Sequence, residues 1–143
     1  MSPIPASVRI ARPTDRLEPL VRQYEQALGL QRLGGFDDHD GFDGVMLGHP
    51  GQPWHLEFTR ERGAAAGGGP SPEHLLVLYL GDESAHRAAV ERARAAGMRE
   101  VAAHNPYWAR TGVTFEDLDG YRVVLAPGTW PSTAGDPAVA AAR

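Results

Sequence analysis

The chain has 143 residues, 42% hydrophobic and 22% charged, which is the composition of a globular protein with one sizeable core. Its formal charge of −4, with 14 scattered Lys and Arg residues, argues against a nucleic-acid-binding surface. The absence of cysteine excludes disulfides, a thiolate nucleophile and Cys-ligated zinc. Without a signal-peptide pattern or a membrane-length apolar run, we expect a cytoplasmic protein that contacts neither nucleic acid nor membrane.

The first half of the chain predicts a strand, a helix and three further strands. Apolar residues recur at helical spacing from Leu17 to Leu28, with Gly29 where a helix commonly ends. Asp15 and Glu18 have the spacing of a capping box at the start of this helix. The acidic Asp37–Gly41 segment predicts a turn. The strands are expected at residues 7–11, 30–36, 45–47 and 54–59.

The second half repeats this order after a flexible linker at residues 63–72. The expected elements are a strand at 74–80, a helix capped by Asp82 or Ser84 and stopped by Gly97, a strand at 99–102, an irregular segment at 104–108 and a hairpin at 113–125. Asp119-Gly120 predicts a tight primed turn in that hairpin. We therefore expect a single domain of two modules, at about residues 7–62 and 73–130, and a loose tail at 131–143.

Two local patterns occur in this duplicated frame: residues 23–30, which end the first helix, and residues 117–121, near the end of the second module. Together they resemble the vicinal oxygen chelate superfamily, which includes glyoxalase I, bleomycin-resistance proteins and extradiol dioxygenases. The resemblance covers about residues 7–127. It implies an α+β fold in which two tandem βαβββ modules form a curled, cup-shaped mixed sheet. Because members commonly pair, it also implies a homodimer.

Metal enzymes of this superfamily take their ligands from the first and last strands of each module. Carried over by resemblance, these positions fall on Arg9, Glu57, His74 and Val124. Neither arginine nor valine ligates a cation, and two remaining ligands are fewer than the three that catalytic zinc usually has. The resemblance with this departure implies no metal cofactor, and a pocket in which the Arg9 guanidinium takes the metal's place beside Glu57.

An alternative metal site remains open on the residues themselves. His55 precedes Glu57 by two, so both side chains point to one face of their strand. With His74 they would form a two-histidine, one-carboxylate set for a divalent metal such as Zn, Ni, Fe or Mn. Glu57 would then be the catalytic base of a lyase, epimerase or dioxygenase. Against this, a carboxylate paired with Arg9 is a weaker base, and the pair can also be purely structural.

Other side chains complete the predicted pocket. Tyr107 and Trp108 lie in a connection, where large aromatic residues either line a ligand site or pack as a lid. Arg122 shares a strand face with Val124 and could reach an anionic ligand group. We therefore predict binding of a small aromatic or polar metabolite or drug, with the enzyme as the alternative. The predicted ligand-binding residues are Arg9, His55, Glu57, His74, Tyr107, Trp108, Arg122 and Val124.

Overall fold

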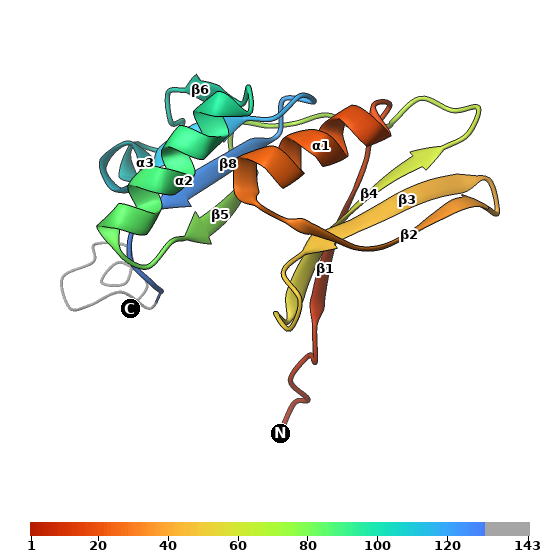
Figure 1. Ribbon diagram of the computed structural model, residues 1–143, viewed down its shortest axis with the longest axis horizontal. Coiled ribbons are helices and arrows are strands. Elements are labelled where there is room, and N and C mark those ends of the chain that lie inside the picture. Colours follow the sequence, from red (N-terminus) through yellow and green to blue (C-terminus); the bar gives the residue numbers. More distant parts are fainter. Residues whose placement is uncertain (131–143) are drawn as a thin grey trace. The chain divides into compact units, whose positions relative to one another are not determined.

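The computed structural model describes residues 1–130, and these divide into two compact units, the first ending at Pro70 and the second beginning at Ser71. Each unit contains one four-stranded mixed sheet that is not closed into a barrel (Figure 1). The expected α+β fold of two tandem βαβββ modules is confirmed. The loose tail expected at residues 131–143 lies outside the described residues.

The first unit contains one helix and four strands. These are β1 (Val8–Pro13), α1 (Leu17–Leu28), β2 (Gln31–His39), β3 (Phe42–Gly48) and β4 (Trp54–Glu61). The strand order is β1-β4-β3-β2, with β1 parallel to β4 and the other pairs antiparallel. Such a parallel pair requires a crossover, which α1 and the β2–β3 hairpin provide.

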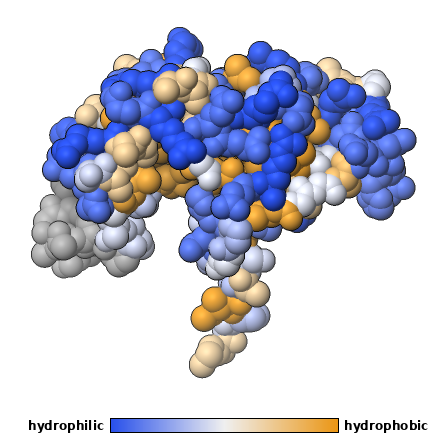
Figure 2. All heavy atoms as spheres, viewed as in Figure 1, coloured by the Kyte–Doolittle hydropathy of each residue, from blue (hydrophilic) through white to orange (hydrophobic). Residues whose placement is uncertain are grey.

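Helix α1 covers one face of the first sheet. Tyr24 is fully buried, and its ring meets that of Phe58 edge-on with centroids 4.9 Å apart. Arg12 Nη2 donates a hydrogen bond of 2.7 Å to the Tyr24 hydroxyl. The outer side of α1 carries hydrophilic residues such as Glu18 and Arg22 (Figure 2). Because side chains alternate along a strand, neighbours of Phe58 in β4 point the other way. We call the face away from a unit's own helix its distal face.

The second unit repeats the topology of the first. Its elements are β5 (Leu75–Tyr79), α2 (Glu83–Ala95), β6 (Arg99–Val101), α3 (Pro106–Thr111), β7 (Val113–Glu116) and β8 (Arg122–Ala126). The strand order is β5-β8-β7-β6, with β5 parallel to β8. Arg94 of α2 pairs with Glu100 of β6, so Glu100 and its cross-strand partner Phe115 lie on the α2 face. Thr114, the neighbour of Phe115, therefore lies on the distal face.

Of the four predicted ends of helices α1 and α2, three are confirmed by the structure. Gly29 closes α1 with a φ of 68°, a value that favours glycine, and Gly97 follows α2 with a φ of 81°. Asp82 caps α2 by accepting a 2.7 Å hydrogen bond from Ala85 N. The predicted capping box at Asp15 is wrong. Helix α1 has no side-chain cap, and the Asp15 carboxylate instead accepts a hydrogen bond from Ala66 N at 2.8 Å.

The connections of the second unit differ from two expectations. The segment expected to be irregular at 104–108 contains the start of α3. In the β7–β8 hairpin, Gly120 has the predicted positive φ, 85°, but Asp119 does not, so the two-residue primed turn is wrong. Asp117 N donates to Tyr121 O at 2.8 Å, and Asp117 Oδ1 accepts from the amides of Asp119 and Tyr121. The buried Asp117 side chain thus organises a longer loop.

Strand β2 extends to His39, beyond the point where the sequence predicts a turn. Its end is held by Asp43 of β3, whose Oδ1 accepts hydrogen bonds from Asp38 N at 2.9 Å and from Arg62 Nη2 at 2.8 Å. The Arg62 guanidinium, followed by the Asp38 amide, lowers the pKa of Asp43 below its ordinary value. Asp38 itself adopts a φ of 45°, so local pairing with Asp43 compensates a conformation that L residues rarely adopt.

We expect Arg62→Gln to lower the melting temperature by a few degrees near neutral pH, and this effect to shrink steadily as the pH is lowered below the ordinary pKa of a carboxyl group. A carboxyl group with a lowered folded-state pKa contributes stability above its ordinary pKa of about 3.9, and this contribution is lost as the pH falls through the folded-state value. Thermal unfolding followed by circular dichroism at several pH values measures the difference. Arg87→Gln, which removes an exposed pair with Glu83, is the matched control. An equal loss at every pH would contradict this assignment.

Candidate functional site

A cluster of three polar side chains lies on the distal face of the first unit. Arg9 and His55 are direct partners in the β1–β4 register, and Glu57 follows on the same face of β4. Arg9 Nε donates a hydrogen bond of 2.9 Å to His55 Nε2, and Arg9 Nη1 lies 3.3 Å from Glu57 Oε2. The Glu57 side chain is 13% exposed and that of Arg9 is 48% exposed. The structure thus brings together three of the residues that the sequence singled out.

The hydrogen bonds within this cluster determine what it can bind. Because Arg9 donates to Nε2, His55 must present a lone pair there and carry its proton on Nδ1 as a neutral imidazole. Arg9 and Glu57 carry opposite charges, so the cluster as a whole is neutral. The guanidinium occupies one ligating atom of each neighbour, His55 Nε2 and Glu57 Oε2, and its positive charge lies where a cation would sit, so these three residues do not fit a metal ion. Within residues 1–130, no three His, Cys, Asp or Glu side chains gather as a metal-ligand group.

An apolar floor lies beside the polar cluster on the same face. The Phe36 ring lies directly on Gly44, where a Cβ atom would come within 2.3 Å of the ring. Leu33 packs in the same way against Gly48, the cross-strand partner of His55. Glycine at these two positions lets large side chains lie flat on the sheet. The first unit therefore presents apolar surface next to hydrogen-bonding groups.

His74 lies beside the first strand of the second unit. It is exposed and immediately precedes β5, which starts at Leu75. Leu75 lies opposite Arg122 in the parallel β5–β8 pair, and Arg9 lies opposite His55 in the parallel β1–β4 pair. When Arg122 is taken as the counterpart of His55, Leu75 becomes the counterpart of Arg9, and the site role expected of His74 stays a prediction. A difference of one residue in this alignment exchanges the two faces of a strand.

Arg122 and Val124 share the distal face of the second unit, as the alternation predicted. Val124 is fully buried at the position that corresponds to Glu57. Arg122 is largely buried, with Nη1 donating to Ala102 O at 3.2 Å and Nη2 lying 3.9 Å from Glu116. Its guanidinium therefore holds the end of β6, and its expected contact with an anionic ligand group stays a prediction.

Tyr107 and Trp108 lie in the first turn of α3. Their ring centroids are 4.8 Å apart, and the centroid of the Trp108 ring lies 6.4 Å from that of Tyr79 in β5. Asn105 caps the helix by accepting a 3.0 Å hydrogen bond from Tyr107 N, with Pro106 in the first turn. The Asn-Pro pair is the signal from which sequence reasoning could have found this helix.

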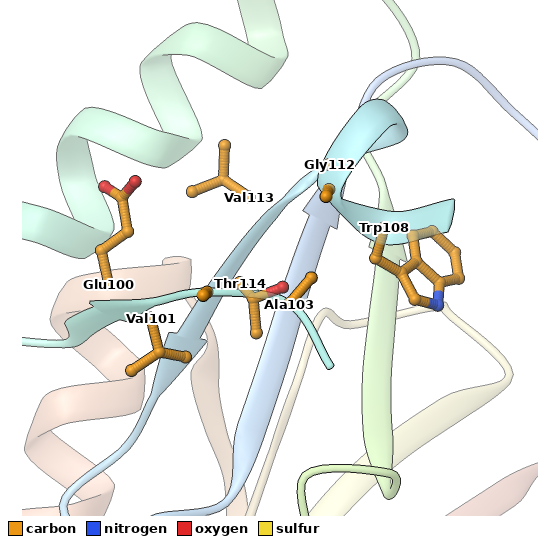
Figure 3. A pocket seen from close by; sticks show the side chains of 9 residues that line it. Glu100, Val101, Ala103, Trp108, Gly112, Val113 and Thr114 are labelled. Carbon is orange, nitrogen blue, oxygen red and sulfur yellow. The ribbon is translucent and has the colours of Figure 1, made fainter. Parts of the chain in front are cut away.

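Trp108 lines a pocket of about 280 Å³ in the second unit (Figure 3). The lining residues come from β6, α3 and β7: Glu100, Val101, Ala102, Ala103, Trp108, Ala109, Gly112, Val113 and Thr114. Of these, the sequence pointed only to Trp108. The small residues that leave the space carry no chemical signature in a sequence.

Comparison with known proteins decides the family. The YycE-like N-terminal domain matches residues 8–59 and the YycE-like C-terminal domain matches residues 73–127. The chain belongs to the YycE-like family. It is 44% identical over 120 residues to the uncharacterized protein YycE of Bacillus subtilis, covering 84% of this chain and 86% of the relative. A crystal structure of a YycE protein of unknown function from that organism matches with a TM-score of 0.80 and 41% identity, covering 92% of this chain and 94% of that one.

More distant structures share the fold of this YycE-like chain. Leishmania major glyoxalase I has a TM-score of 0.67 at 18% identity, covering 89% of this chain and 88% of the enzyme. TnmS3, an antibiotic binding protein from Streptomyces sp. CB03234, has a TM-score of 0.60 at 18% identity, covering 90% and 98%. The expected membership of the vicinal oxygen chelate superfamily is confirmed.

The two YycE-like domains carry different features. The Arg9 cluster lies entirely within the N-terminal domain, and the Trp108 pocket lies entirely within the C-terminal domain. None of the described helices is both long and apolar enough to span a bilayer.

Proposed function

We propose that this YycE-like protein binds a small aromatic or polar organic molecule without a metal and without transforming it. The observation that supports this most is the contact of Arg9 with both His55 and Glu57. A guanidinium has five donors and no lone pair to offer, so it can replace a metal as a positive group but not as a Lewis acid. What remains at the site is hydrogen bonding.

The surroundings of Arg9 suit such a ligand. Two of its N–H groups contact His55 and Glu57, which leaves other donors of the exposed guanidinium for a carbonyl or carboxylate of the ligand. Phe36 and Leu33 offer apolar surface on the same sheet face. A few polar groups beside apolar surface are typical of small-molecule sites. The fold is shared with an antibiotic binding protein, so sequestration is a role to which this architecture is suited.

The second candidate is a glyoxalase-like lyase, epimerase or dioxygenase. It is favoured by the largely buried carboxylate of Glu57, and the solved Bacillus subtilis YycE is described as a suspected glyoxalase or fosfomycin resistance protein. In this version His55, Glu57 and His74 would hold Zn, Ni, Fe or Mn, or Glu57 would act alone as a base. Against it stands the contact of Arg9 Nη1 with Glu57 Oε2 at 3.3 Å, because a carboxylate oxygen that accepts from a guanidinium is not directed at a substrate proton.

Elemental analysis of protein purified without chelator tests the proposal directly. We expect far less than one equivalent of zinc, nickel, iron or manganese per chain, and no change of melting temperature on adding a chelator. A thermal-shift screen of aromatic antibiotics and thioesters should then yield a ligand whose stabilisation is lost in Arg9→Gln. A stoichiometric metal that a chelator removes with loss of stability would overturn the proposal. A cytoplasmic homodimer remains part of it, on the superfamily resemblance alone.

A further inference from the structure

The pocket in the second unit has the size of a small organic ring system. Its volume is about 280 Å³, whereas a dry cavity of about 150 Å³ is enough to hold benzene. Figure 3 shows Ala103 and Thr114 at its middle, Trp108 at one end, and Glu100 and Val101 at the other. All lining residues belong to one unit, so this site requires nothing from the Arg9 cluster.

Backbone contacts hold the pocket walls before any ligand binds. Arg122 fixes one wall by donating to Ala102 O at 3.2 Å. The other wall is α3, which Asn105 caps and which ends where Gly112 N donates to Trp108 O at 3.0 Å. Gly112 lies so close to β8 that a Cβ atom would come within 2.9 Å of Val124 Cγ1. A preformed pocket binds more tightly because little order is lost on association.

The chemistry of the lining favours an uncharged aromatic ligand. The Trp108 indole offers an aromatic surface against which a flat ring can stack or pack edge-on. Glu100 is the one acidic lining residue, and its Oε1 already lies 2.9 Å from Arg94 Nε and 2.8 Å from Arg94 Nη2. Its charge is thus compensated on the α2 side. A cationic ligand would gain little there, and an anionic ligand would meet no free cation among the lining residues.

Thr114 supplies a polar group in the pocket. The residue is only 4% exposed, and its side chain lies beside Ala103 at the middle of the pocket (Figure 3). A threonine hydroxyl can both donate and accept a hydrogen bond. A hydroxyl or carbonyl group on the ligand would bond to it, so the preferred aromatic compound carries one such polar substituent.

We propose that the pocket between β6, α3 and β7 binds a neutral one- or two-ring aromatic compound that stacks on Trp108 and hydrogen-bonds to Thr114. This goes beyond the proposed function, because it assigns a second site and a chemical class of ligand. The Trp108 indole determines where the aromatic part of the ligand lies, and the Thr114 hydroxyl determines which substituted compounds bind.

The probe for this proposal is 2-naphthol, which is neutral near pH 7, with naphthalene as the matched compound that lacks the hydroxyl. Nitrogen-labelled protein is titrated while the indole N–H signals of Trp54, Trp108 and Trp130 are followed by NMR. We expect saturable shifts of the Trp108 signal, with the Trp54 signal unchanged. Thr114→Val should weaken 2-naphthol by about tenfold, the equivalent of one hydrogen bond, and leave naphthalene unaffected.

A filled pocket is the decisive variant. Ala103→Leu should abolish the Trp108 shifts with both compounds, and Ala109→Leu serves as a second filling variant if the first does not fold. Unchanged signals of the other indoles report that the fold is intact. Binding that survives in a folded filled variant, or no Trp108 shift up to the solubility limit of 2-naphthol, would overturn the proposal. Arg9→Gln should leave these shifts unchanged. The proposal for the Trp108 pocket can therefore fail without affecting the proposal for the Arg9 cluster, and the two failures are distinguishable.

Discussion

Arg9→His is expected to turn the first unit into a binding site for zinc or nickel, with a dissociation constant in the micromolar range or below. The register places residue 9 opposite His55, and Glu57 shares their sheet face. The substitution therefore adds a second imidazole to a histidine and a carboxylate, which is a common ligand set for divalent transition metals. It also removes the guanidinium that occupies both existing ligands. Isothermal titration with zinc and nickel chloride measures the gain.

Two further measurements make this result specific. Arg9→Gln removes the same charge without adding a ligand, so it should bind metal at least about tenfold more weakly than Arg9→His. Affinity in the histidine variant should fall at acidic pH, because imidazole ligates only when deprotonated. If Arg9→His and Arg9→Gln bind equally, the three side chains do not converge as described, and Arg9 does not stand in a metal's place.

Phe58→Ala is expected to destabilise the first unit by about 3–5 kcal/mol, a range typical of a buried Phe truncated in a core. The Phe58 side chain is 1% exposed and lies edge-on against the Tyr24 ring. The Arg12 guanidinium carbon lies 5.1 Å from the centroid of the Phe58 ring. Truncation removes all of these contacts and leaves a cavity beneath α1. Urea unfolding followed by circular dichroism gives the change in free energy.

The control for this loss is a phenylalanine on the adjacent strand. Phe42 in β3 is 39% exposed, so Phe42→Ala should cost well under half as much. A loss of less than about 1 kcal/mol in Phe58→Ala, or equal losses in both variants, would show that the α1 interface is not the core of this unit.

The elements whose residues repeat with a clear period were predictable. The spacing of apolar residues and Gly29 predicted α1, and strict alternation predicted β4, because periodicity reflects burial on one side. The α1 cap was not predictable, since the Asp15 carboxylate is engaged by Ala66, 51 residues further along the chain. The strand expected at residues 30–36 forms as part of β2, but its extension to His39 was not predictable, because pairing with β3 and the Asp38–Asp43 contact hold that end.

The polar cluster followed from the sequence, and the pocket did not. Alternation alone puts His55 and Glu57 on one face, and Arg9 joins them in the parallel register. The place of His74 relative to the cluster stays a prediction, because a motif match does not determine register to a single residue and His74 immediately precedes β5. The Trp108 pocket depends on where the chain turns after β6 and on the small volume of Ala103, and neither property recurs with a period.

The matching register of β1–β4 and β5–β8 gives each residue on one parallel pair a counterpart on the other. Where one copy has Arg9, His55 and Glu57, the other has Leu75, Arg122 and Val124. Val124 is sealed from solvent, whereas Arg9 remains hydrated. At these three positions the first unit thus carries only polar side chains, whereas the second unit carries two aliphatic side chains and one arginine. The effect of a substitution in one unit can therefore be compared with the effect of a substitution at the equivalent position of the other unit.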